Sequence, residues 1–141
     1  MLAAFIGFCA GLGAFTFVYG HGESYLSTDP EACINCHIMN QPYDGWLKSP
    51  HHAVAVCVDC HLPHDGLAKW LSKADQGLRH SWGFTFNNFH EPIRLNGHAR
   101  EIVNENCARC HADMVTHLVP TRDPEFDCIR CHASMAHGPV R

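Results

Sequence analysis

The longest hydrophobic run lies at the start of the chain, where Leu2–Tyr19 is almost wholly apolar and contains no charged residue. Its length of about 18 residues is near the lower limit for a helix that crosses a bilayer. A cleaved signal peptide is the alternative, but the run is longer than a usual signal core, lacks a basic leader, and precedes no clear small-x-small cleavage site. We therefore predict an uncleaved transmembrane anchor over residues 1–22 and a second domain over residues 23–141.

After the anchor, a helical period of apolar residues is clear over residues 67–86. The apolar stripe of this predicted amphipathic helix consists of Leu67, Trp70, Leu71, Ala74, Leu78 and Trp82. The order Asp29, Pro30, Glu31 is typical of a helix start, because proline suits the first turn and acids suit the N-terminal dipole. We also expect a loop over residues 87–96, a short helix over 99–107 and a linker over 114–127.

Cysteine and histidine dominate the chemistry of the chain, with nine cysteines and thirteen histidines in 141 residues. Eight of the cysteines form four Cys-x-x-Cys-His motifs, whose pairs are Cys33 and Cys36, Cys57 and Cys60, Cys107 and Cys110, and Cys128 and Cys131. The two thiols of such a motif can each form a thioether to one vinyl group of a haem, while the adjoining histidine reaches the iron. A single copy would fit a disulfide or structural zinc as well, but four copies favour four covalently bound haem c groups. The ninth cysteine, Cys9, lies in the apolar run and is predicted to be a packing residue.

Four haem groups would also explain why aliphatic residues are sparse outside the anchor, since they cannot alone fill a core for about 120 residues. We predict a mainly α fold with much irregular chain, in which one N-terminal transmembrane helix precedes a small haem-packed multihaem cytochrome c domain. Because c-type haem is attached outside the cytoplasm, this domain is expected on the outer side of the membrane. The formal net charge of −4 gives no reason to expect a nucleic-acid partner.

Axial ligands for the four irons follow in part from the motifs. His61, His111 and His132 are the predicted proximal ligands of the second, third and fourth haem. The first motif offers a choice, because Met39 lies two residues beyond His37 and a thioether ligand would raise the haem potential. Distal ligands would come from histidines outside the motifs, which are His21, His51, His52, His64, His80, His90, His98, His117 and His137.

The residues around the first motif resemble a known family. The segment Ser24–Asn40, S-Y-L-S-T-D-P-E-A-C-I-N-C-H-I-M-N, is similar to the NapC/NirT/NrfH family of membrane-anchored tetrahaem quinol dehydrogenases. The likeness covers nearly the whole chain and includes the anchor, the four motifs, residues 57–63, Ser72-Lys73-Ala74, His80-Ser81, Asn106-Cys107 and His137-Gly138. Within the family, it is greatest to the members that serve cytochrome c nitrite reductase.

The resemblance implies roles for three residues at the first haem. Met39, rather than His37, would ligate this haem, whose weak or open distal side would lie beside a quinol pocket at the membrane surface. Lys73 matches a family lysine near the quinol. His80 falls where some relatives have an aspartate, and a side chain of either kind would accept a quinol proton.

Two further histidines match family distal ligands, namely His137 and His52, with the neighbouring His51 as the alternative to His52. We expect His52 to serve the fourth haem and His137 the third. The second haem is then left without a distal ligand from this chain. A residue of a partner subunit would complete it, which predicts a hetero-oligomer.

The function implied by the resemblance is that of a quinol dehydrogenase and electron-transfer subunit. The protein would oxidise menaquinol in the lipid bilayer and pass electrons to the catalytic subunit of a periplasmic multihaem reductase, cytochrome c nitrite reductase. We expect a single-pass protein of the inner membrane with its haem domain on the periplasmic side. The alternatives are another periplasmic reductase as partner (nitrate, trimethylamine oxide or hydroxylamine-type), a soluble multihaem shuttle, and an independent nitrite or hydroxylamine reductase. The last is disfavoured because the chain contains no Cys-x-x-Cys-Lys motif.

Overall fold

The architecture, taken from a computed structural model, is built of helices joined by irregular chain. Residues 1–117 and 127–139 are described, and no strand occurs among them. The α-helices are α1 (Leu2–Tyr19), α2 (Asn40–Leu47), α3 (Cys57–His61), α4 (Gly66–Phe86), α5 (Gly97–Cys110), α6 (Ala112–Val115) and α7 (Cys128–His132). The 3₁₀-helices are η1 (Gly22–Leu26), η2 (Pro30–Asn35), η3 (His37–Met39) and η4 (Pro50–Ala53). The predicted mainly α fold is confirmed.

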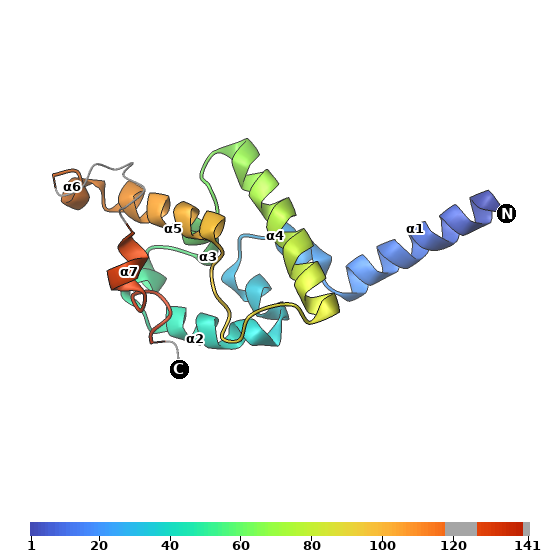
Figure 1. Ribbon diagram of the computed structural model, residues 1–141, viewed down its shortest axis with the longest axis horizontal. Helices are drawn as coiled ribbons and strands as arrows, with labels where there is room; N and C mark the ends of the chain where they lie inside the picture. The colour runs from blue at the N-terminus through green and yellow to red at the C-terminus, as the bar shows by residue number, and fades with distance from the viewer. Residues whose placement is uncertain (118–126, 140–141) are drawn as a thin grey trace.

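Helix α1 projects from the rest of the molecule as a single rod, as Figure 1 shows. None of its residues is buried, and its length and apolar composition are sufficient to cross a membrane. Its bounds, Leu2 and Tyr19, are those of the apolar run in the sequence. The division of the chain at residue 22 stays a prediction.

Helix α4 is the longest helix and begins and ends at defined capping residues. The Asp65 side chain accepts a hydrogen bond from the Ala68 N–H at 2.8 Å, which satisfies a free donor of the first turn. The helix ends where Asn87 adopts the left-handed conformation, with φ of 50°. The helix predicted over residues 67–86 is thus confirmed and begins one residue earlier, at Gly66.

Helix α5 is longer than predicted at both ends, since it runs from Gly97 to Cys110 instead of over residues 99–107. Its earlier start follows from Asn96, whose side chain accepts a hydrogen bond from the Ala99 N–H at 2.8 Å. The loop predicted over residues 87–96 is confirmed. The linker predicted over residues 114–127 begins inside α6, and its residues 118–126 lie outside the described part of the chain.

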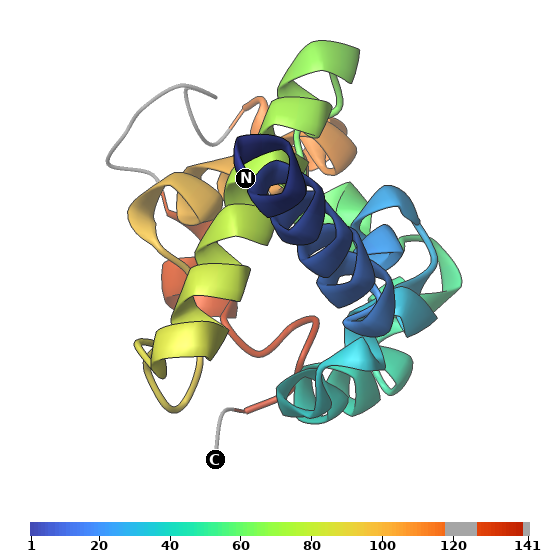
Figure 2. The same cartoon turned by 90° about the vertical axis from the view of Figure 1, so that its right-hand side faces the viewer.

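The apolar stripe of α4 is turned away from the rest of the domain. Leu67 and Leu78 are each 74% exposed and Trp82 is 62% exposed, whereas Lys73, from the polar side of the helix, is only 7% exposed. In Figure 1, α4 lies nearer to α1 than α3, α5, α6 and α7 do, and Figure 2 looks onto this side of the domain from the free end of α1. The helical period therefore predicted the helix correctly, but its polar side, and not its apolar side, packs on the protein.

The buried apolar core of the described residues is small and consists of Trp46, Leu62, Ile102 and Val103. A buried amide completes it: the Asn106 Nδ2 donates to the carbonyl oxygens of Cys60 and Leu62, each at 2.9 Å. These hydrogen bonds join α5 to the segment of α3. The second and third motifs are consequently held against each other.

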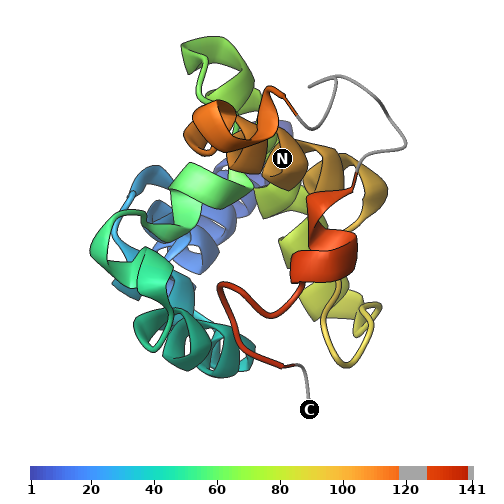
Figure 3. The same cartoon turned by 90° about the vertical axis from the view of Figure 1, so that its left-hand side faces the viewer.

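A second polar cluster joins α5 to the start of α7. Arg100 Nε donates to Asp127 Oδ2 at 2.7 Å, and Asn104 Nδ2 donates to Asp127 Oδ1 at 3.1 Å. The hydrogen bond from Arg100 holds the pKa of the Asp127 carboxyl below its ordinary value. Figure 3, viewed from the side opposite to α1, shows the chain after α7 turning back toward α2.

Candidate functional site

The first and second Cys-x-x-Cys-His motifs are in direct contact. The thiol of Cys57 lies close enough to Cys33 to interact with it, and this interaction is the largest cause that lowers the pKa of Cys33 to about 7. Burial opposes the shift, and the ammonium group of Lys73 adds to it. Lys73 of α4 therefore lies within electrostatic range of the first motif.

The third and fourth motifs follow the second in space, so that the four motifs form a row. Burial is the largest cause that raises the pKa of Cys60, and the charge of Cys110 in the third motif raises it further. Burial likewise raises the pKa of Cys107 to about 11, with a further contribution from Cys128 in the fourth motif. Neighbouring motifs in the sequence are thus neighbours in space, from the first to the fourth. All nine cysteines lie among the described residues, and none of them forms a disulfide.

Two histidines far apart in the sequence face each other at the second motif. The ring centroids of His61 and His137 are 6.0 Å apart. Burial is the main cause that lowers the pKa of His61 to about 4, and His137 adds to the shift. His137 Nδ1 lies 2.8 Å from the carbonyl oxygen of Pro42. A carbonyl only accepts hydrogen bonds, so Nδ1 must donate and the Nε2 atom of His137 is left without a proton.

A second pair of rings lies at the third motif. The ring centroids of His51 and His111 are 6.2 Å apart, and His51 Nδ1 is buried with no hydrogen-bond partner among the described residues. The exposed ring of His52 instead packs edge-on against Trp46, with centroids 4.7 Å apart. The structure therefore brings His51, and not the predicted His52, to a motif histidine.

Both ring pairs have the separation that one shared iron requires. A metal–imidazole bond of about 2 Å on each side, with about 1 Å from nitrogen to ring centre, gives about 6 Å between centroids. A buried imidazole nitrogen without a partner, as in His51, fits the same role. The pairing differs from the sequence-based expectation: His137 lies beside His61 of the second motif, not beside the third.

The other two predicted iron ligands lie in different surroundings. Met39 ends η3 and is half-buried, while His37 at the start of the same turn is exposed. His132 of the fourth motif is exposed, and no aromatic or imidazole ring pairs closely with it in the described ranges 1–117 and 127–139.

Helix α4 presents a polar face to the first motif. Lys73 Nζ donates to the carbonyl oxygen of Ser27 at 2.7 Å and lies 5.3 Å from the centre of the Trp70 ring. Burial lowers the pKa of Lys73, and the nearby ammonium of Lys69 lowers it further. The predicted lysine is thus held beside the first motif and is not an ordinary surface residue.

Two turns further along α4, His80 is hydrogen-bonded to Tyr25. The Tyr25 hydroxyl and His80 Nδ1 are 2.6 Å apart. Burial is the main cause that raises the pKa of Tyr25 to about 12, and partial burial lowers the pKa of His80. Tyr25 is accordingly the donor and the neutral His80 the acceptor. Sequence reasoning missed this role of Tyr25, because 55 residues separate it from its partner and no motif links them.

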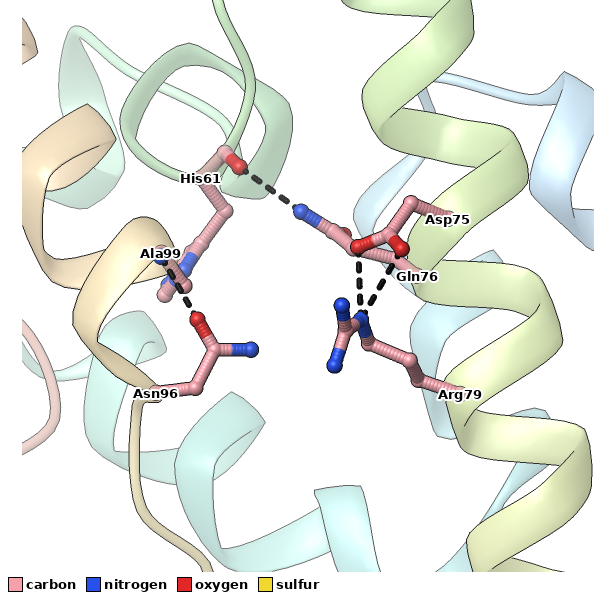
Figure 4. A network of polar contacts seen from close by, with 6 residues as sticks. All are labelled: His61, Asp75, Gln76, Arg79, Asn96 and Ala99. Atoms are coloured by element: carbon pink, nitrogen blue, oxygen red, sulfur yellow. Dashed lines mark hydrogen bonds and ion pairs between the residues drawn. The ribbon is translucent and has the colours of Figure 1, made fainter.

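The same helix also contacts the second motif, as Figure 4 shows. Gln76 Nε2 donates to the carbonyl oxygen of His61 at 3.2 Å. Arg79 and Asp75 form an ion pair on the neighbouring surface, with Nε and Oδ2 2.8 Å apart. With Lys73 at the first motif and Gln76 at the second, α4 spans the junction between them.

Comparisons with known proteins agree with this arrangement. A family model described as the NapC/NirT cytochrome c family, N-terminal region, matches residues 1–141. The chain is 37% identical to the cytochrome c-type protein NrfH of Wolinella succinogenes, over 95% of this chain and 84% of that protein. It is 36% identical to the cytochrome c nitrite reductase subunit NrfH of Nitratidesulfovibrio vulgaris, over 82% of this chain and 71% of that protein.

A solved structure is similar over almost the full length. It is a chain of the cytochrome c nitrite reductase NrfHA complex bound to the HQNO inhibitor, with a TM-score of 0.70 and 29% sequence identity. The match covers 97% of this chain and 92% of that chain.

Proposed function

The chain belongs to the NapC/NirT cytochrome c family, and from this membership we propose that it is a membrane-bound cytochrome that oxidises menaquinol and passes electrons to a cytochrome c nitrite reductase. Two relatives are NrfH proteins, and one of them is named as a subunit of that reductase. The similar solved chain belongs to an NrfHA complex. These relatives support a periplasmic nitrite reductase catalytic subunit as the partner in a hetero-oligomer.

As a cytochrome c, the protein holds haem c covalently, and we infer one haem at each of the four motifs. Haem c supplies one-electron transfer at its iron when it is bound. His61 and His137 would hold the second haem, and His111 and His51 the third. His132 would hold the fourth haem. Because His137 lies beside His61, the fourth haem and not the second, as expected from the sequence, is the one that we propose a residue of the partner subunit completes, and the exposure of His132 supports this.

The proposal rests above all on the position of Lys73. A buried ammonium group costs free energy unless it has partners, and the described residues give Lys73 two, the Ser27 carbonyl as acceptor and the face of the Trp70 ring. Its remaining N–H groups are available to a quinol oxygen beside the first motif. A cation at this place stabilises the negative charge that develops when a quinol hydroxyl loses its proton. Met39, which is half-buried at the end of η3, would hold the first haem.

The pair of Tyr25 and His80 supplies a route for the proton. The neutral His80 can take the Tyr25 hydroxyl proton at Nδ1, across 2.6 Å, while the Tyr25 oxygen takes a proton from the quinol. His80 Nε2 then gives its proton to solvent, which leaves the remaining proton on Nδ1. Proton exchange of the exposed ring with solvent returns the tautomer with its proton on Nε2, and only then can Nδ1 accept from Tyr25 again. His80 is exposed, so this last transfer needs no further side chain.

The two outward-facing apolar elements support a location at the membrane. Helix α1 is the proposed anchor in the inner membrane, and α4, whose apolar stripe is exposed, lies on the side of the domain from which α1 projects. The four haem motifs would then lie on the periplasmic side. A quinol that leaves the bilayer beside α1 would meet α4 and the first motif before any other part of the domain.

The proposal is tested on the full-length protein extracted from membranes with detergent. We expect it to co-purify with a multihaem nitrite reductase and to support nitrite reduction to ammonium with a reduced menaquinone analogue as electron donor. Recovery in the soluble fraction, or haem that this quinol does not reduce, would contradict the proposal. Co-purification with a nitrate or trimethylamine oxide reductase would contradict the proposed partner.

A further inference from the structure

The backbone of the segment that follows α7 lies so close to α2 that no side chain would fit between them. Gly45 lies in the last turn of α2, and a Cβ atom added there would be 2.6 Å from the carbonyl carbon of His137 and 2.8 Å from its Cα. The carbonyl oxygen of His137 would be closer still. All three atoms belong to the backbone, so no side-chain rotation could relieve the overlap. Only glycine at position 45 permits this approach.

A hydrogen bond one turn earlier in α2 fixes the ring of the same histidine. His137 Nδ1 donates to the Pro42 carbonyl oxygen at 2.8 Å. A histidine that ligates a metal commonly donates its other ring N–H to a carbonyl, which sets both the tautomer and the ring orientation. Here that arrangement leaves Nε2 of the neutral His137 ring without a proton, and the ring centroid of His61 is 6.0 Å from that of His137.

The surroundings of this contact are open. A cavity of about 840 Å³ lies beside the contact, between α2 and the residues that follow α7. His137 itself is exposed, and the chain turns sharply at Gly138, which has φ of +69°. The approach at Gly45 and the hydrogen bond to Pro42 therefore both constrain where the His137 ring lies.

We propose that Gly45 is a positioning residue for the second haem. Because glycine has no side chain, the backbone of His137 can approach α2. The Pro42 carbonyl then orients the His137 ring, and these two contacts would together place Nε2 where it can bind the iron that His61 also binds. The inference rests on the proposed function only in requiring a haem at the second motif. It requires neither quinol oxidation nor a particular reductase.

The experiment compares Gly45→Ala with Gly97→Ala in the full-length holoprotein. Gly97 is also helical, and an added Cβ there meets no atom within 4 Å, so it is a matched control for the intrinsic effect of alanine. We expect both variants to retain four haems by intact mass. In Gly45→Ala alone, electron paramagnetic resonance should show one low-spin haem converted to high-spin. Added imidazole should restore the low-spin signal, because it replaces the displaced ring.

Two further outcomes decide between positioning and general stability. If Gly45 acts through His137, the spectrum of the double variant Gly45→Ala/His137→Ala should equal that of His137→Ala alone. A further loss of low-spin signal in the double variant would overturn the proposal. So would an unchanged spectrum in Gly45→Ala, or failure of that variant to accumulate while His137→Ala and Gly97→Ala do. Electron delivery from quinol is a separate readout, so failure of the proposed function would leave this result intact.

Discussion

At the scale of single residues, η3 separates two candidate ligands by burial. His37 and Met39 stand at opposite ends of one short turn, and Met39 is half-buried while His37 is exposed. A thioether is uncharged and adaptable, so its partial burial needs no compensating partner. The inward position of Met39 favours it as the ligand of the first haem.

Replacement of Met39 by leucine should keep all four haems attached, because the cysteines are untouched. We expect quinol oxidation to fall at least about 100-fold, the upper range for lost metal-site contacts, since leucine offers no lone pair to the iron. Stopped-flow reduction by a menaquinol analogue measures the effect. Met114→Leu, at a 69% exposed position, is the control and should behave as wild type. Quinol oxidation by Met39→Leu at the wild-type rate would show that Met39 is not the ligand and would favour His37.

Lys73 offers a second test at the same scale. Lys73→Leu should weaken binding of the inhibitor HQNO by at least about tenfold, the loss expected when a hydrogen bond from a charged donor is removed. Lys69→Leu, one turn earlier on α4 and free of the Ser27 contact, should change binding far less. Fluorescence titration of HQNO gives both values. Equal affinities would place Lys73 outside the quinol site.

The dependence of quinol oxidation on pH should report His80. Only neutral imidazole accepts a proton, and partial burial holds the pKa of His80 below its ordinary value of 6.5. The neutral form therefore persists as the pH falls, and the acid limb of the rate should lie below pH 6.5. His80→Gln should slow oxidation by about 100-fold and remove this limb, whereas His90→Gln should retain it. An acid limb at or above pH 6.5 would contradict the assignment.

At the scale of elements, α4 shows what a helical period does and does not determine. The period and the capping residues define where the helix lies, to within one residue. They do not define which face turns inward, because the apolar stripe remains exposed and Lys73 is buried. A helix that lies between a domain and a bilayer can bury its apolar face against either of them, since both offer apolar surroundings. The orientation is decided by contacts with distant residues, namely Tyr25 and Ser27.

The junction of α5 and α7 gives a stability prediction. The pKa of Asp127 is lowered mainly by the hydrogen bond from Arg100, so the folded state favours the carboxylate. This contribution is fully present above the ordinary pKa of 3.8 and is lost as the pH falls through the lower folded value. Asp127→Asn should therefore destabilise the protein by about 1 kcal/mol at pH 7, a value that allows for partial solvent screening.

Denaturant unfolding at pH 7 and at pH 2 measures this difference, which should nearly vanish at the lower pH. Asp75→Asn is the control, because it breaks the exposed pair with Arg79 and should change stability less. A difference that stays the same at both pH values would show that the ion pair is not its cause.

At the scale of the whole molecule, the four motifs form a row held by polar contacts more than by an apolar core. Asn106 joins the second and third motifs, and Arg100 joins the third and fourth through Asp127. Four side chains make up the buried apolar core of the described residues. So small a core stabilises a domain of this size poorly, and the haem groups must supply much of the missing apolar contact.

The haem-free chain should accordingly lack a cooperative fold. If the protein is produced without haem attachment, we expect much less helix by circular dichroism, no cooperative thermal transition, and rapid proteolysis after residue 22. The holoprotein, treated in the same detergent, is the control. A cooperative transition in the haem-free chain would show that its own side chains suffice.

Much of this organisation is predictable from the sequence, and the exceptions share a physical reason. The anchor, α4 and the motifs follow from local signals, since period, capping residues and spacing all lie within one segment. The closeness of His137 to His61, and of His51 to His111, depends on approaches between distant segments. Gly45 has no local signal at all, because a missing side chain matters only when another backbone comes near.

The contact between Pro42 and His137 spans 95 residues of sequence. In the proposed topology the chain beyond the anchor is exported in sequence order, so Cys57 and Cys60 would reach the haem-attachment machinery long before residue 137 emerges. Thioether formation at the second motif can therefore precede its final coordination. In the order of maturation, the second haem would be among the first attached and among the last completed, and export that stalls before His137 would leave it open to foreign ligands.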